Sequence, residues 1–299
     1  MFEKGIKEAF NRYILGNLEN KKQDKIVNEI RPRVKVLEIQ QRNGLEIHVL
    51  KMQDMNVEKE NIKRFQLGES MNHLSNGKLI FVGETGSGKT TLVNSIVNNL
   101  LGVKYSDNFR YSLFDLKNKT RSESESQTDA VTEYTINYID GMNRKCNFVF
   151  VDTPGLEDTR GVEVQKENIQ QILKYIREHP SKVGLVIQSS TCRLTAEQKS
   201  ILLDMKALIE AGNITSLIVL STFADSDSPS VIGVLDGFEI PYTHLFLFNN
   251  NALYSRNQGI SANDLLSFTM NWNASNRSIE TLLDFLRPDV KTEAVKDSC

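Results

Sequence analysis

The chain has 299 residues, of which 25 % are charged and 39 % hydrophobic, and its formal net charge is −2 at pH 7. This composition is typical of a globular protein with one large α/β domain plus extensions, or at most two domains. A charge so close to zero gives no electrostatic indication of a nucleic-acid or anionic-membrane partner. Three widely spaced cysteines form neither a disulfide framework nor a zinc motif.

Segments that would attach the chain to a membrane are not visible in the sequence. No run approaches the roughly 18 to 20 apolar residues that a spanning helix needs, and the first ten residues lack the apolar centre of a secretion signal. Position 2 is Phe2 rather than the glycine of a myristoylation site. Cys299 is in the last position, whereas a prenylation box has its cysteine fourth from the end. We therefore expect a cytoplasmic protein without a membrane segment or lipid anchor.

The first 76 residues show patterns typical of both helices and β-strands. Residues 5–18 have apolar side chains at helical spacing. Residues 34–39 and 45–50 alternate apolar with polar side chains around the turn signal Asn43-Gly44, which predicts a β-hairpin. The charged stretch 54–64 is most simply a solvated helix face.

A phosphate-binding loop follows. Residues 83–90, GETGSGKT, match the pattern G-x-x-x-x-G-K-[ST] at every fixed position. The apolar run 79–82 precedes the loop, and residues 92–100 carry apolar side chains at helical spacing. A strand, a glycine loop and a helix in this order let backbone N–H groups and a helix N-terminus converge on phosphate oxygens.

Each loop residue has an expected role. Lys89 would reach the β- and γ-phosphates, and the Thr90 hydroxyl would bind Mg²⁺. The glycines let the main chain bend around the phosphates without a Cβ in the way. The nucleotide-binding residues expected from this loop are Gly83, Thr85, Gly86, Ser87, Gly88, Lys89, Thr90 and Thr91.

Residues 102–125 are polar with little apolar periodicity, which is typical of a mobile loop. A β-branched and aromatic alternation at 131–138 predicts the next strand. Thr128, just before that strand, is placed to close over Mg²⁺ and the γ-phosphate. Thr132 is the alternative, because the sequence does not fix the length of the loop.

The next apolar run, 146–151, leads directly into Asp152-Thr-Pro-Gly155. A D-x-x-G pattern at a strand end supplies a carboxylate for the Mg²⁺ shell and a glycine N–H for the γ-phosphate. Leu156 then stands where small GTPases such as Ras have the glutamine that orients the attacking water. An apolar side chain cannot position water, so we expect slow intrinsic hydrolysis.

Two more strands are expected at 183–188 and 216–221, separated by a helix that begins near Thr195 with the capping-box partner Gln198. The second strand ends in the sequence TFAD, at the place where GTPases carry a guanine-reading [N/T]-K-x-D motif. Phe223 replaces the lysine of that motif, and its flat ring suits coverage of a base face.

The last elements follow the same order. A strand at 244–248 ends in three asparagines, of which Asn250 is the expected neighbour of the base. A helix is expected at 278–286, Trp272 before it is expected in the core, and the tail 288–299 is expected to be disordered.

The ordered set GETGSGKTT, SQT, DTPG, TFAD and FNNNAL resembles the septin-like and immune-associated (GTPase of immunity-associated protein) branch of the translation-factor-related P-loop GTPases, over roughly residues 77–287. The resemblance implies an α/β G domain whose mostly parallel central sheet has helices on both faces. It implies GTP/GDP and Mg²⁺ as cofactors, with Thr222 and Asp225 at the base and Asn250 near it. It also implies a homodimer or higher assembly through the G domain.

The sequence thus predicts an N-terminal extension (1–76), a GTP-binding G domain (77–287) and a tail (288–299). The expected function is a slow GTPase with Lys89, Thr128 and Gly155 as catalytic groups and Thr90, Thr128 and Asp152 as metal ligands. The alternatives are a nucleotide-binding scaffold without hydrolysis and an ATP-binding protein. The ATP alternative rests on Phe223, which weakens the guanine signature.

Overall fold

The computed structural model describes residues 30, 33–57, 62–71, 73–113, 130–142, 144–156 and 162–287, without the side chains of Val162 and Glu197. The helix expected at 5–18, the tail 288–299 and Thr128 lie outside these residues.

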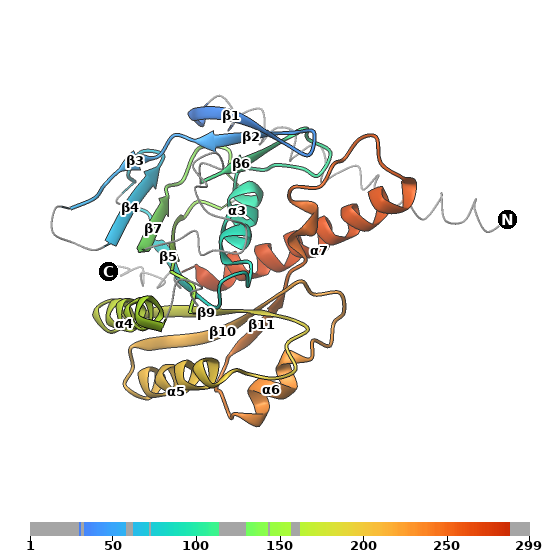
Figure 1. Cartoon of the computed structure of the whole chain (residues 1–299). Helices are drawn as coiled ribbons and strands as arrows, with labels where there is room; N and C mark the ends of the chain where they lie inside the picture. The colour runs from blue at the N-terminus through green and yellow to red at the C-terminus, as the bar shows by residue number, and fades with distance from the viewer. Residues whose placement is uncertain are drawn as a thin grey trace, which may run out of the picture.

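A large sheet forms the centre of the molecule (Figure 1). Its strand order is β11-β10-β9-β5-β8-β7-β4-β3. Pairing is parallel except between β7 and β8 and between β3 and β4, which are antiparallel. The strands are β3 (Gln53–Asp54), β4 (Ile62–Leu67), β5 (Asn76–Val82), β7 (Val131–Ile136), β8 (Asn147–Asp152), β9 (Ser181–Gln188), β10 (Ile214–Thr222) and β11 (His244–Leu247).

Helices cover both faces of this sheet, which confirms the predicted fold class. Leu79 and Phe81 of β5 pack in one core with α3 and α7, whereas Ile80 and Val82 pack in a second core with α4, α5 and α6. A strand buried on both faces has no polar side, which is why residues 79–82 form a continuous apolar run. The helices are α3 (Lys89–Leu100), α4 (Val162–Glu178), α5 (Ala196–Glu210), α6 (Val231–Gly237) and α7 (Ala262–Leu286).

A smaller sheet lies beside α3, with the order β1 (Val36–Arg42), β2 (Leu45–Leu50) and β6 (Phe109–Ser112). The expected hairpin is present as the antiparallel β1–β2 pair. Its turn residues Asn43 and Gly44 have φ angles of 51° and 77°, the left-handed values that an Asn-Gly hairpin turn requires. Strand β6 was not predicted, because it pairs in parallel with β2 from a segment that reads as a polar loop.

The prediction of a helix at 54–64 is wrong in both parts of this stretch that the structure describes, residues 54–57 and 62–64. Asp54 belongs to β3, and Ile62 begins β4, which pairs in parallel with β7. The charged residues of this stretch suit an exposed sheet edge as well as a helix face. The N-terminal region therefore adds β3 and β4 to the edge of the central sheet.

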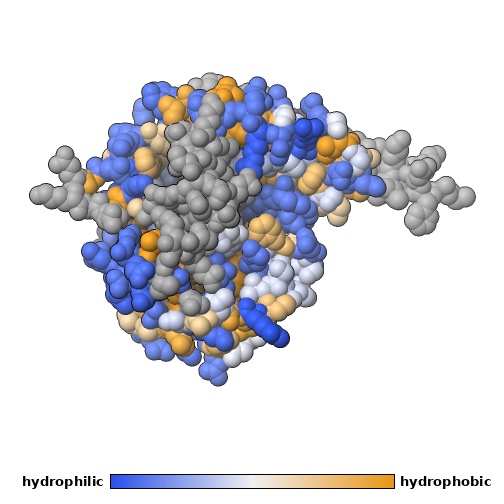
Figure 2. Space-filling model, in the orientation of Figure 1, coloured by the Kyte–Doolittle hydropathy of each residue, from blue (hydrophilic) through white to orange (hydrophobic). Residues whose placement is uncertain are grey.

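The visible surface in Figure 2 is mainly hydrophilic, with hydrophobic residues spread over it, some of them at the top, where Figure 1 shows the β1–β2 hairpin. Leu37 and Ile39 of β1 are 62 % and 52 % exposed. Within the described residues, the helices are all too short or too polar to cross a membrane.

Candidate nucleotide-binding site

The phosphate loop joins β5 to α3 as predicted. Gly88 precedes the helix with φ 92°, a conformation that side-chain-bearing residues rarely adopt. At Gly83 a Cβ would lie 2.2 Å from the carbonyl oxygen of Val186 in β9. Both glycines are therefore required by the local geometry, one for its φ angle and the other for the close approach of β9.

Lys89 is buried under this loop. Its Nζ donates hydrogen bonds to the carbonyl oxygens of Gly83 (2.8 Å) and Glu84 (2.7 Å). Burial lowers the pKa of Lys89 to about 8, and the negative charges of Asp152 and Glu84 oppose this shift. The lysine charge thus lies at the centre of the loop, where its carbonyls and nearby carboxylates stabilise it.

Two oxygen donors for a divalent cation meet beside the lysine. The Thr90 hydroxyl donates a hydrogen bond of 3.1 Å to the carboxylate of Asp152, and Asp152 is fully buried at the end of β8. A hydroxyl and a carboxylate are hard oxygen ligands of the kind that Mg²⁺ prefers. The donor set therefore fits the predicted cation.

The structure locates one of the two candidate switch threonines. Thr132 pairs with Asp152 across β7 and β8, but it is buried within the strand and its hydroxyl donates to the carbonyl of Ala130 (3.0 Å). Because its side chain is buried and its hydroxyl is already hydrogen-bonded, Thr132 is not favoured as the residue that closes over a phosphate. Thr128 lies outside the described residues.

The D-x-x-G segment packs directly on the phosphate loop. A Cβ on Gly155 would lie 2.0 Å from Thr85 Oγ1 and 2.8 Å from the Thr85 backbone nitrogen. The Leu156 N–H donates to the Gly83 carbonyl (3.2 Å), while the Leu156 side chain is 4 % exposed and packs in the core with α4 and α5. The backbone of Gly155 therefore faces the loop, and the side chain that follows it points into the protein interior.

The TFAD segment, residues 222–225, also contacts the phosphate loop. The Thr222 hydroxyl donates to the carbonyls of Ser87 (2.7 Å) and Ile187 (3.3 Å), which ties the end of β10 to the loop and to β9. Phe223 follows with φ 52° and is 51 % exposed. An exposed large aromatic residue in a left-handed conformation is strained and uncovered, and such positions are frequent at functional sites.

The asparagine cluster meets TFAD through a residue that the sequence did not single out. Asn249 Nδ2 donates to the Asp225 carboxylate (2.8 Å), and the Asn249 side-chain oxygen accepts from the Asn251 N–H (3.4 Å). Asn250 instead accepts a hydrogen bond from Ser95 of α3 (2.9 Å). Asn249 therefore orients the carboxylate, a role that only the tertiary contact reveals.

A second residue beyond the predicted set is Gln198. Its side-chain oxygen accepts from the Thr195 N–H and the Thr195 hydroxyl accepts from the Gln198 N–H, which is the predicted capping box of α5. The Gln198 amide also donates to the carboxylate of Glu84 in the phosphate loop. The N-terminus of α5 is thereby linked to the loop.

The phosphate loop, the TFAD segment and the asparagine cluster each contribute residues to the wall of a cavity of about 570 Å³. The lining includes Gly88 of the loop, Thr91 of α3, Thr222 at the end of β10, Phe223 directly after it, and Asn250. A volume of this size is within the range of small-molecule sites. The cavity is also lined by Arg42 at the end of β1, by Asn43 of the hairpin turn and by residues 254–256, which the sequence did not connect with this site.

Comparisons with known proteins bear on this site. The septin family model matches residues 75–197, which is less than half of the chain but includes the phosphate loop and the D-x-x-G segment. The search of curated proteins found no match. A crystal structure of a dimerization-deficient mutant of Toc33 from Arabidopsis thaliana matches with 13 % identity and a TM-score of 0.39, over 69 % of this chain and 85 % of that one.

The likeness to Toc33 is too low to support an argument from that structure. The septin match does not depend on it and covers the segment in which Lys89, Thr90, Asp152 and Gly155 lie. Together with the strand order and the geometry of the phosphate loop, it shows that this chain is a septin-like P-loop GTPase by fold.

Proposed function

We propose that this protein binds GTP and GDP with Mg²⁺ and hydrolyses GTP slowly. The observation that carries the proposal is the convergence of Lys89, Thr90, Asp152 and Gly155 around one glycine loop at the carboxyl ends of β5 and β8. Nucleotides bind at this edge of open α/β sheets. Of the predicted catalytic groups, Lys89 and Gly155 lie at this loop, which supports the roles proposed for them.

Lys89 would exchange its two loop carbonyls for the β- and γ-phosphate oxygens, which are stronger acceptors because they are charged. Thr90 and Asp152 would hold Mg²⁺, which neutralises charge on the phosphates. The N–H of Gly155 would contact the γ-phosphate. We propose Thr128 as the switch threonine, a choice supported by the engagement of Thr132 with Ala130.

For the base, we propose that the Asp225 carboxylate accepts hydrogen bonds from guanine N1 and its 2-amino group. The bond from Asn249 supports this role, because it fixes the orientation of the carboxylate. Asn250 lines the cavity and would lie near the purine carbonyl. Phe223 lines the same cavity and would cover one face of the base.

The experiment is fluorescent-nucleotide binding to wild type, Lys89→Ala and Asp225→Asn, with GTP, ATP and XTP as competitors. We expect only GTP to compete with wild type, Lys89→Ala to lose binding, and Asp225→Asn to shift preference toward XTP. Equal competition by ATP together with an unchanged Asp225→Asn variant would show that TFAD does not read guanine. The protein would then be an ATP-binding phosphate-loop protein.

One observation favours a second candidate, a nucleotide-binding scaffold without turnover. Leu156 directs its side chain into the core, so this position contributes no group that orients water. A partner or a second subunit would then have to supply that group. Single-turnover hydrolysis measured over a range of protein concentrations separates the two: a slow, concentration-dependent rate supports the GTPase, and no phosphate release supports the scaffold.

We also propose that the unit formed by residues 77–287 self-associates in the GTP state, as the family resemblance implies, and that the protein is cytoplasmic. Analytical ultracentrifugation with a non-hydrolysable GTP analogue, and separately with GDP, tests the association. A mass that doubles only with the GTP analogue supports it. A monomer in both states contradicts it.

A further inference from the structure

We propose that the turn of the N-terminal hairpin forms a wall of the nucleoside pocket and that a purine base lies between Arg42 and Phe223. This inference rests on the proposed nucleotide binding and extends it to a part of the chain that lies outside the segment matched by the septin family model. It assigns a ligand contact to a region for which the sequence indicated only a hairpin.

The two side chains approach one cavity from different layers of the molecule. Phe223 follows β10 of the central sheet, whereas Arg42 ends β1 of the small sheet on the α3 side (Figure 1). Both line the cavity of about 570 Å³ that also contains Gly88 and Thr91 from the phosphate loop and α3. A nucleotide whose phosphates lie on that loop therefore has its nucleoside between these two layers.

The hairpin turn is fixed in this position by reciprocal hydrogen bonds. Asn43 Nδ2 donates to the carbonyl of Tyr254 (3.1 Å), and Arg256 Nε donates to the carbonyl of Asn43 (3.2 Å). The turn residues Asn43 and Gly44 hold left-handed φ angles suited to a tight hairpin. The wall is thus pre-organised, which reduces the entropy cost of ordering it on binding.

Arg42 is held flat by a neighbouring ring. The centre of its guanidinium lies 4.4 Å from the centroid of the Tyr254 ring, and Asn94 of α3 donates a hydrogen bond to the Tyr254 hydroxyl (3.1 Å). A planar, weakly hydrated guanidinium stacks on aromatic faces, purine rings included. Phe223 lines the same cavity, and it is half exposed although it is apolar. These two groups suit an aromatic ligand better than a sugar or a peptide.

Stacking contacts the face of a base and not its edge. Every base has such a face, so the Arg42–Phe223 pair would lengthen the residence of a nucleotide without selecting guanine over adenine. Selection would remain with Asp225. We call the Arg42–Phe223 pair the clamp. Removing either of its side chains should change the dissociation rate of any purine nucleotide that binds.

The test measures dissociation of fluorescent GDP from the full chain by competition with excess GDP. The variants are Arg42→Ala, Arg42→Lys and Phe223→Ala, with Lys89→Ala as the phosphate-loop reference. Arg33→Ala is the matched control, because Arg33 precedes the same hairpin but pairs with Asp140 on the surface (2.8 Å). Thermal unfolding of each variant shows that it is folded before its rate is compared.

We expect Arg42→Ala and Phe223→Ala each to release GDP about five- to thirtyfold faster than wild type, the range that one cation–π or stacking contact supports. Arg33→Ala should release it at the wild-type rate. Arg42→Lys should stay close to Arg42→Ala, because lysine keeps the charge and loses the planar group.

Three results would overturn the clamp while nucleotide binding itself stands. Wild-type dissociation from Arg42→Ala would show that the hairpin does not touch the nucleoside. A wild-type dissociation rate in Arg42→Lys would show a charge contact to a phosphate. Dissociation from Arg33→Ala that is as fast as from Arg42→Ala would show an effect of net charge. Wild type that binds no nucleotide, or binds it independently of Lys89, contradicts the proposed function instead.

Discussion

At the scale of single residues, Gly155 decides how closely the D-x-x-G segment packs on the phosphate loop. A Cβ there would meet Thr85 side-chain and backbone atoms at 2.0 Å and 2.8 Å, and a backbone atom cannot rotate away. We expect Gly155→Ala to lower the free energy of unfolding by about 1–3 kcal/mol, the usual cost of overpacking. Urea denaturation measures this.

The matched control is Gly233→Ala in α6, where a Cβ meets no atom within 4 Å. Alanine is the better helix former, so this variant should be neutral or more stable by up to about 1 kcal/mol. Equal urea midpoints for the two variants would contradict the proposed packing of Gly155 on Thr85.

If Lys89 binds phosphate as proposed, nucleotide affinity should depend on pH. Burial lowers its pKa to about 8, while an unfolded lysine keeps its ordinary value of 10.5. Between these values the unfolded chain binds more protons than the folded one, so this group makes the protein more stable as pH rises from about 8. Phosphates bind the ammonium form, so we expect the Kd for GDP to increase as pH rises above 8.

Calorimetric titration in buffers of different ionisation enthalpy checks this directly. Binding at pH 9 should take up protons, because the bound phosphates favour the charged form of Lys89. Binding at pH 7 should not take up protons at Lys89, because the side chain is already charged. A Kd that stays constant from pH 7 to pH 9.5 would contradict the lowered pKa.

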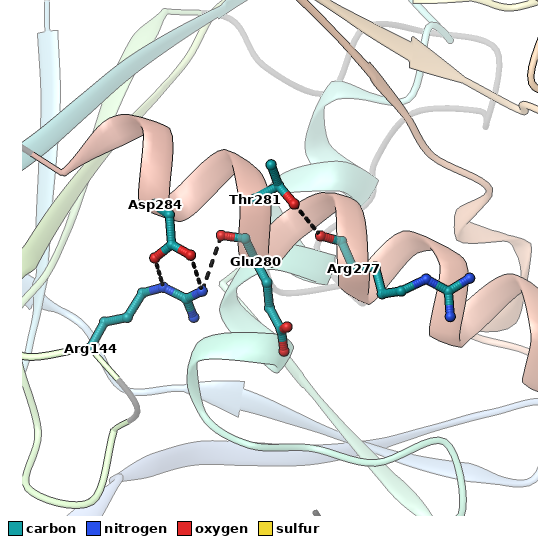
Figure 3. Close-up of polar contacts among 5 residues, drawn as sticks. All are labelled: Arg144, Arg277, Glu280, Thr281 and Asp284. Carbon is teal, nitrogen blue, oxygen red and sulfur yellow. Dashed lines mark hydrogen bonds and ion pairs between the residues drawn. The ribbon is translucent and has the colours of Figure 1, made fainter. Parts of the chain in front are cut away.

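At the scale of elements, the β7–β8 connection is joined to the C-terminal turns of α7 by Arg144 (Figure 3). Arg144 donates to both carboxylate oxygens of Asp284 (2.9 and 3.2 Å) and to the carbonyl of Glu280 (3.0 Å). The hydrogen-bonded guanidinium lowers the pKa of Asp284 below its usual 3.8. A bidentate pair of this kind fixes orientation as well as distance.

We expect this pair to stabilise the fold by about 0.5–1 kcal/mol, because Asp284 is 58 % exposed and water screens its charge. Since the folded pKa of Asp284 is the lower one, this contribution is complete above pH 3.8 and is lost as pH falls through the folded value. A double-mutant cycle with Arg144→Met and Asp284→Asn measures it. The cycle for the exposed Lys174–Glu178 pair of α4 serves as a control and should give a smaller coupling.

At the scale of the whole molecule, the N-terminal strands complete both sheets. β4 pairs with six residues of β7, and β2 pairs with β6. A chain shortened to begin at residue 75, where the septin family match starts, would leave the edge of β7 unpaired. Exposed strand edges promote association between chains. We expect this shortened chain to aggregate at concentrations where the full chain does not, as measured by light scattering.

A less drastic variant perturbs the β4 edge without shortening the chain. Replacing Phe65 of β4 with proline removes a donor from the β4 ladder and leaves the hairpin sequence intact. This variant should also scatter more light than the full chain after mild heating. A shortened chain that stays monodisperse would show that the sheet does not need β4 at its edge.

The sequence by itself determined the parts of this protein that depend on local chemistry. The glycine loop with Lys89 and Thr90, the D-x-x-G segment, the Asn43-Gly44 turn and the capping box at Thr195 each occupy a few consecutive positions. Their residue types are dictated by φ angles, hydrogen-bond donors and charge within the same segment. Strands β5, β8, β9 and β10 were also evident, because strands buried on both faces form apolar runs.

Tertiary structure alone decided the contacts between distant segments. β4 and β6 join their sheets through partners more than 50 residues away, and neither strand carries an apolar run of its own. Asn249 reaches Asp225 across 24 residues, and Arg42 lines the same cavity as Phe223 from a separate layer. Periodicity records which face of an element is buried but not which element covers it. The part of the candidate site that the hairpin forms therefore became visible only once the chain was folded.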